Sequence, residues 1–258
     1  MDPATIIGVG LALVVVVLSN ILEGGNPMSL LLFPPMLLVF GSTLLVAFAG
    51  GTVADFKLAV RGLVQAFTGR AQTAGDLVPS IVTLAEKARR EGLLSLEDSL
   101  SGIDDPFLVR ALTLAIDGTD PEELREMLES EVQAQKVEHR QAAKFFAAAG
   151  GYAPTIGIIG TVMGLVHVLE NLARPEELGH LIAGAFVATL WGVLTANVMW
   201  LPIGNKLKRV AEIEAHHMQL VMEGVLAVQA GANPRVIEQK LLSFLPAGER
   251  PESTEKAA

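Results

Sequence analysis

The chain has no cysteine among its 258 residues, and long parts of it carry no charge. The missing thiols exclude disulfides and thiolate metal sites. Four stretches lack Asp, Glu, Lys and Arg, namely residues 3–22, 24–54, 145–169 and 181–205. A membrane-spanning helix needs about 20 mostly apolar residues, so each stretch is long enough for one span. With a mean hydropathy of +0.47, the chain is not a soluble enzyme, a disordered tail or a disulfide-stapled secreted domain.

The four uncharged stretches predict an all-α integral membrane protein with four transmembrane helices. A helical cytoplasmic domain is expected between spans two and three, and a helical extension after span four. The predicted domains are a transmembrane hairpin (1–54), a cytoplasmic helical domain (55–144), a second transmembrane hairpin (145–205), a cytoplasmic helical extension (206–245) and a disordered tail (246–258).

Local signals place the ends of the longer helices. Asp120 followed by Pro121 is a typical helix start, and no Gly or Pro interrupts the chain from there to Lys144. We therefore predict one long helix that begins at residue 121 and runs into span three. Span four is expected to continue to about Val228, before the Gly-Ala-Asn-Pro break at 231–234 and a last short helix.

The distribution of positive charge orients the spans. Residues 55–144 hold 11 of the 19 Lys and Arg, residues 206–258 hold seven, and the short turns on the other side hold only Arg174. The positive-inside rule places the large segment and both termini in the cytoplasm. The net charge of −9 gives no indication of a nucleic-acid partner.

The predicted spans contain no carboxylate and no Lys or Arg. A chain that relays protons across a membrane usually needs an acid within it. Either this chain moves no ions, or a partner subunit brings the acid. His167 is the titratable residue of span three, and its place near the outer end fits an interfacial role better than a relay. No nucleophile–base pair, metal-ligand spacing or phosphate loop occurs, so we expect neither an enzyme nor a cofactor.

Spans three and four carry small residues at helical spacing, a pattern that lets two helices approach closely. Tight packing of the two spans is expected, either against each other or across a subunit interface. The alternative is that small residues are simply common in membrane helices. The residues concerned are Gly157, Gly160 and Gly164 in span three, and Gly184, Ala188, Gly192 and Ala196 in span four.

Two threonines and two charged residues have both a structural and a functional interpretation. Thr155 and Thr189 would ordinarily bond to their own helices, but they could instead help to solvate an ion. Arg89 lies in a last helical turn and Glu97 in a first one, where each charge favours the helix dipole. The residues alone therefore do not require a function for any of the four.

Four sequence motifs resemble a known family. They are LEGGNP (22–27), ARREGLLSLED (88–98), YAPTIGIIGTVMGL (152–165) and AFVATLWGVLTANVMWLP (185–202). In order and spacing they are similar to the MotA stator subunits of the bacterial flagellar motor, within the MotA/TolQ/ExbB proton channel family. The resemblance extends over residues 4–245.

The resemblance implies an ion-driven rotary machine in the bacterial cytoplasmic (inner) membrane. Five such chains would surround a dimer of a MotB-like subunit, whose single span carries the ion-binding Asp. The cytoplasmic part would contact a FliG-like rotor protein, and the spans would contact membrane lipid. The transported ion is expected to be H⁺, with Na⁺ as the alternative.

The resemblance also assigns roles to particular residues. The matching positions are two prolines that couple ion flow to movement, two threonines of a ring that faces the partner helix, and two charges that engage the rotor. They are Pro154 and Pro202, Thr155 and Thr189, and Arg89 and Glu97. Arg90 adds a second basic residue beside Arg89, which leaves open which arginine meets the rotor.

Two alternative functions remain at this stage. An ExbB/TolQ-like energiser of outer-membrane transport uses the same ion-driven principle, but such chains have three spans and an outside N-terminus, whereas four spans are expected here. A passive membrane scaffold would equally lack an intramembrane acid. Ion flux measured with and without a MotB-like partner separates the scaffold from the stator.

Overall fold

The computed structural model describes residues 4–68 and 74–245, which form helices joined by short turns. No strand occurs among these described residues, and the predicted all-α fold is confirmed. The predicted disordered tail, residues 246–258, lies outside the described residues. In chain order the elements are α1 (Ala4–Leu22), η1 (Pro27–Leu30), α2 (Phe33–Ala49), α3 (Val53–Thr68), α4 (Ala74–Glu91), η2 (Leu93–Gly102), α5 (Pro106–Ile116), α6 (Pro121–Glu170), α7 (Pro175–Thr195), η3 (Ala196–Trp200), α8 (Leu201–Gln229) and α9 (Pro234–Phe244).

Three helical stretches of the described chain are long and apolar enough to cross a membrane: Ala4–Leu22, Pro121–Glu170 and Pro175–Gln229. The remaining predicted span corresponds to α2, whose 17 residues lie at the lower end of the range for a span. The helix predicted from residue 121 into span three is confirmed as α6. Span four does continue to Gln229, but the π-helix η3 interrupts it between α7 and α8.

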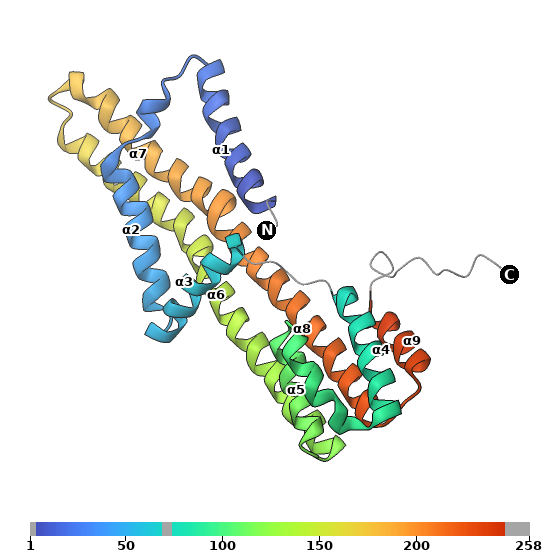
Figure 1. Ribbon diagram of the computed structural model, residues 1–258. Helices are drawn as coiled ribbons and strands as arrows, with labels where there is room; N and C mark the ends of the chain where they lie inside the picture. Colours follow the sequence, from blue (N-terminus) through green and yellow to red (C-terminus); the bar gives the residue numbers. More distant parts are fainter. Residues whose placement is uncertain (1–3, 69–73, 246–258) are drawn as a thin grey trace. The chain divides into compact units, whose positions relative to one another are not determined.

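The chain divides into two compact units, Met1–Arg70 with Glu138–Val210 and Ala71–Val137 with Ala211–Ala258. In the first unit α2 packs against α7, as Figure 1 shows. The indole Nε1 of Trp191 on α7 donates to the carbonyl oxygen of Leu30 at 2.6 Å, and the Trp191 ring packs against Phe40 of α2. These contacts fix η1 and the middle of α2 to the last turns of α7.

A row of aromatic rings forms part of the core of the first unit. It runs from Phe48 on α2 through Phe56 on α3 to Phe145 and Phe146 on α6, and ends at Trp200 in η3. Successive ring centroids lie 5.4 to 6.5 Å apart. Edge-to-face and stacked pairs at such distances each contribute about 0.5–1.5 kcal/mol beyond the area that they bury. The row therefore joins the consecutive helices α2 and α3 to α6 and η3, which come much later in the chain.

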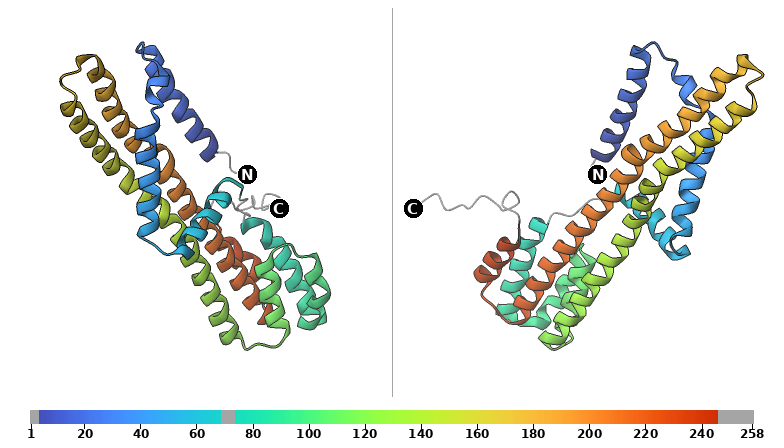
Figure 2. Two further views of the ribbon diagram at one scale, coloured as in Figure 1. Left: turned by 90° about the vertical axis from the view of Figure 1, so that its left-hand side faces the viewer. Right: turned by 180° about the vertical axis from the view of Figure 1, so that it is seen from behind.

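The second unit is a helical bundle with its own apolar core, and Figure 2 shows its helices from two further sides. Apolar side chains from η2, from α4, α5, α8 and α9, and from the first turns of α6 fill this core. Its fully buried members include Ile81, Leu96, Leu108, Leu112, Leu124, Leu128, Leu220, Ile237 and Leu241.

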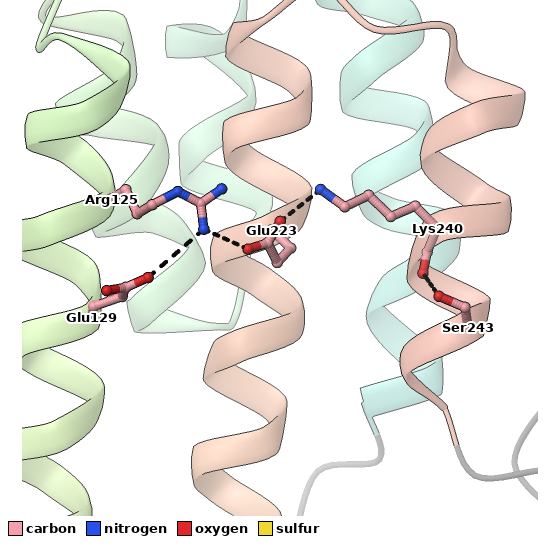
Figure 3. A network of polar contacts seen from close by, with 5 residues as sticks. All are labelled: Arg125, Glu129, Glu223, Lys240 and Ser243. Atoms are coloured by element: carbon pink, nitrogen blue, oxygen red, sulfur yellow. Dashed lines mark hydrogen bonds and ion pairs between the residues drawn. The ribbon is translucent and has the colours of Figure 1, made fainter.

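A network of ion pairs joins three helices of the second unit (Figure 3). Glu223 of α8 accepts from Arg125 of α6 at 2.7 Å and from Lys240 of α9 at 2.6 Å. Glu129 lies 3.7 Å from the same guanidinium. Burial raises the pKa of Glu223, but the hydrogen bonds from Arg125 and Lys240 outweigh it and hold the pKa below its usual value. The carboxylate therefore stays charged and ties α9 to the bundle.

A buried carboxylate fixes the start of α5. Asp105 caps this helix, because its Oδ1 accepts from the backbone N–H of Leu108 at 2.6 Å. Its Oδ2 lies 2.7 Å from Nε2 of His217 on α8. Burial raises the pKa of Asp105, but the hydrogen bonds from His217 and Leu108 outweigh it, so that the pKa lies below its usual value. Asp105 therefore stabilises the fold as an anion.

Replacing Asp105 by Asn is expected to lower the free energy of unfolding by about 2 kcal/mol at neutral pH, because a hydrogen bond to an ionised group contributes roughly that much. A group with a lowered pKa contributes fully above its ordinary pKa, here 3.8, and the contribution is lost as the pH falls through the folded-state value. Denaturant unfolding of the purified protein between about pH 3 and pH 7 measures the difference.

The matched control is Asp104→Asn, since Asp104 is adjacent and exposed. We expect that variant to unfold as the wild type does. Equal stability of Asp105→Asn and wild type at neutral pH would show that the carboxylate contributes nothing.

Candidate functional site

Helices α6 and α7 approach each other closely where two glycines face each other. A Cβ atom added to Gly192 would lie 2.6 Å from the carbonyl oxygen of Ala153. One added to Gly157 would lie 2.9 Å from the carbonyl oxygen of Ala188. Real Cβ atoms are essentially never that close to backbone, so the two helices could not approach this far with any larger residue.

The same face of α6 continues toward its C-terminal end with Gly160 and Gly164. A Cβ at either position would lie 2.6 Å from an alanine Cβ of α7, Ala188 for Gly160 and Ala185 for Gly164. Gly184 is not in such close contact, because a Cβ atom added there would lie 3.9 Å from Cδ1 of Leu32. The small residues of span four therefore do not all face the same helix. Ala188 and Gly192 face α6, whereas Gly184 faces Leu32, just before α2.

The last of these small residues, Ala196, lies in the π-helix η3 and is buried in the core of the first unit. Pro202 follows η3 within α8, and Pro154 lies inside α6. Proline cannot donate a backbone hydrogen bond, and a π-helical turn also departs from the regular helical ladder. Both of the predicted coupling prolines thus lie where the regular backbone hydrogen bonds of the helix are interrupted.

Two threonine hydroxyls meet beside the glycine contact. The Oγ1 atoms of Thr161 on α6 and Thr189 on α7 contact each other. Thr161 Oγ1 also lies 3.0 Å from the carbonyl oxygen of Ala185, and both hydroxyls lie within 3.3 Å of the carbonyl oxygen of Gly157. The result is a half-buried group of oxygen atoms between two otherwise apolar helices.

Thr155 does not join this group. Its side chain is exposed, and its hydroxyl donates to the carbonyl oxygen of Tyr152 at 2.8 Å. The sequence resemblance implies a shared role for Thr155 and Thr189 and none for Thr161. The signal for Thr161 was its position one helical turn after Gly157, on the face that packs against α7.

An apolar cavity of about 440 Å³ lies between α2, α6 and α7. Prolines and leucines of the α2 segment and small residues of α6 and α7 line most of it, and His167 and His180 lie at its edge. The Nδ1 atom of His167 lies 3.3 Å from Glu170 on the exposed outer turn of α6. The interfacial position of His167 stays a prediction.

The cytoplasmic candidates lie on either side of a sharp turn. Arg89 and Arg90 are exposed in the last turn of α4, and Glu97 is exposed on η2. Gly92 joins the two elements with a φ of 87°, which favours glycine. Arg90 Nε donates to the carbonyl oxygen of Glu86 at 3.3 Å, so part of that guanidinium is already bonded to its own helix.

The oxygen atoms in the first unit can solvate a cation, but the part of the chain that the structure describes offers no group of three or more His, Asp or Glu side chains that could hold a metal ion. Since the apolar stretches contain no carboxylate, these oxygens are uncharged. The arrangement defines a helical membrane protein whose closely packed helices α6 and α7 hold a small group of uncharged oxygen atoms between them.

Comparison with known proteins gives the family. Residues 99–220 match the model of the MotA/TolQ/ExbB proton channel family. Motility protein A of Bacillus subtilis is 39% identical over 253 residues, which cover 97% of this chain and 93% of that protein. The chain therefore belongs to the MotA/TolQ/ExbB family, and it aligns with motility protein A over almost its whole length.

Two solved structures agree with this assignment. The structure of the flagellar MotAB stator complex from Bacillus subtilis has a TM-score of 0.90 at 38% identity, over 98% of this chain and 100% of that one. The structure of C. jejuni MotAB has a TM-score of 0.91 at 31% identity, over 96% and 97% of the two chains. The likeness thus includes both units.

Proposed function

We propose that this chain is the ring-forming subunit of a flagellar stator, and that it generates torque together with a MotB-like partner. The observation that carries the proposal is the absence of any carboxylate from the four apolar stretches, in a chain similar along its length to subunits of MotAB complexes. A single-span partner with an Asp would supply the titrating group. Five copies around a partner dimer is the stoichiometry that the sequence resemblance implies.

The proposed mechanism is electrostatic. Protonation of the partner's Asp removes its charge, which lowers the cost of placing it against apolar surface. The ring then adopts a new lowest-energy angle around the partner. An ion that crosses the membrane releases about 2.3 kcal/mol per charge for each 100 mV, and this drives the step. The threonine oxygens at Thr161 and Thr189 would solvate the ion on its way.

We further propose four spans in the bacterial inner membrane, with both termini cytoplasmic, lipid around the helices, and H⁺ as the ion, with Na⁺ as the alternative. The excess of Lys and Arg in residues 55–144 and 206–258 supports this orientation. Arg89, Arg90 and Glu97 would face a FliG-like rotor protein. Exposed charge pairs contribute only about 0–1 kcal/mol each, and contacts that form and break with every step need to be weak.

The proposal predicts that proton flux requires the partner. Liposomes that contain this chain alone should hold an imposed pH gradient, and liposomes that contain the complex should dissipate it once the partner's periplasmic part is activated. A pH-sensitive dye measures both rates. Dissipation by this chain alone would overturn the proposal, and an inert complex would favour the passive scaffold. Imposing a sodium gradient in the same assay distinguishes the two ions.

Thr189→Val and Thr161→Val keep the side-chain volume and remove the hydroxyl. We expect each to reduce flux and stall torque together, by about tenfold, because the ion loses one oxygen ligand in an apolar site. Thr155→Val is the matched control on α6 and is expected to have a smaller effect, since that hydroxyl lies apart from the Thr161–Thr189 pair. Unchanged torque in the Thr161 and Thr189 variants would leave them as packing residues.

Glu97→Lys is expected to abolish or strongly impair swimming without lowering the amount of protein in the membrane, because the side chain is exposed and only its rotor contact changes sign. Arg89→Glu should impair swimming more than Arg90→Glu, since Arg90 is partly bonded to Glu86. Swimming speed and immunoblots of membranes measure the two quantities. Glu126→Lys, on the exposed face of α6 in the same unit, serves as the control. Normal motility in the Glu97 variant would contradict the assigned contact.

A further inference from the structure

The most exposed large apolar side chain in the described part of the second unit is Leu94, which is 72% exposed. Single exposed leucines are common and by themselves indicate nothing. Leu94 differs in its position, because it lies in the turn between the arginine pair that ends α4 and the acidic residues of η2.

The backbone around Leu94 holds its side chain outward. Its neighbour Leu93 packs against the core of the second unit, and Leu96 is fully buried in that core. The hydroxyl of Ser95 donates to the carbonyl oxygen of Gly92 at 2.6 Å, and the Ser95 backbone N–H donates to the same oxygen at 3.2 Å. The core positions beside Leu94 are thus already occupied, and the turn is fixed by local hydrogen bonds.

A second connection holds η2 to α4 behind the turn. The Nζ atom of Lys87 on α4 donates to Oγ of Ser99 on η2 at 2.8 Å. Because both elements that flank Leu94 are joined to each other, little conformational freedom remains to be lost when a partner binds here. The turn is therefore preorganised for binding.

Charged groups of opposite sign flank the apolar side chain. Arg89 and Arg90 precede it in the chain, followed by Glu91, and Glu97 and Asp98 come after it, all of them exposed, so that the basic groups lie only on the preceding side. An apolar centre surrounded by a polar rim is the usual composition of a binding hot spot. The partner that fits carries an apolar side chain between an acidic group, opposite the arginines, and a basic group, opposite the carboxylates.

We propose that Leu94 is the apolar anchor of the contact between this chain and the rotor protein, and that an amphipathic helix of the rotor protein with such a charge order packs against it. This inference rests on the proposed function. The charges steer and orient the approaching helix, and they are screened at physiological salt. Burial of Leu94 supplies the part of the contact that salt does not weaken.

The test uses a motile strain in which this chain and its partner subunit replace the strain's own stator. One of the two subunits carries a fluorescent label. The measured quantities are the ratio of motor-bound to freely diffusing complexes, the stall torque and the membrane abundance. Leu94→Ala is expected to lower the bound-to-free ratio about fivefold, which corresponds to about 1 kcal/mol. Leu94→Met keeps an apolar side chain of similar volume and should restore the ratio to within about twofold of wild type.

Val236→Ala is the matched control, because Val236 is 57% exposed on α9 of the same unit, and it should behave as wild type. If Glu97→Lys lowers the ratio and Leu94→Ala does not, the anchor is wrong while the proposed function stands. If neither variant has an effect, both are wrong. If Leu94→Ala reduces membrane abundance, another copy of the chain covers this side chain, and the inference is likewise overturned.

Discussion

The exclusion of ionised groups from the membrane is the constraint on which the rest of this structure depends. An ionised Asp, Lys or Arg at the centre of a bilayer costs about 2.5–3.5 kcal/mol on the scale of translocon insertion, and the four apolar stretches contain none of them. The helices must therefore pack without ion pairs. The glycine faces of α6 and α7 provide that packing, since they bring two backbones into direct contact.

Charge is used instead in the second unit, where it fixes the positions of helices. Glu223 joins α6, α8 and α9 through Arg125 and Lys240, and Asp105 joins the start of α5 to α8 through His217. Each carboxylate keeps a pKa below its usual value because its hydrogen bonds outweigh its burial. These contacts make the bundle rigid. A rigid bundle can transmit a force that acts on the short segment η2, which carries Glu97.

Much of this architecture could be predicted from sequence because its signals are local. The start of α6 at Pro121 and the break before α9 are set by capping residues and prolines within a few positions. The contact of Thr161 with Thr189 and the pair of Asp105 with His217 join residues 28 and 112 positions apart. Such pairs depend on how helices cross, which no local pattern records. The π-helix at Ala196–Trp200 also had no signal in the apolar stretch around it.

The threonine pair also limits the kind of particle that this part of the protein can solvate. Each hydroxyl carries one proton, and a carbonyl oxygen or the other hydroxyl lies within hydrogen-bond distance to accept it, so oxygen electron pairs are what the threonine pair offers outward. Such a group is suited to a cation or a hydronium ion and unsuited to an anion. Thr155 presents its oxygen on an exposed face, apart from this pair. The pair and Thr155 therefore offer their oxygen atoms at separate places, and the pair is the one that lies between α6 and α7.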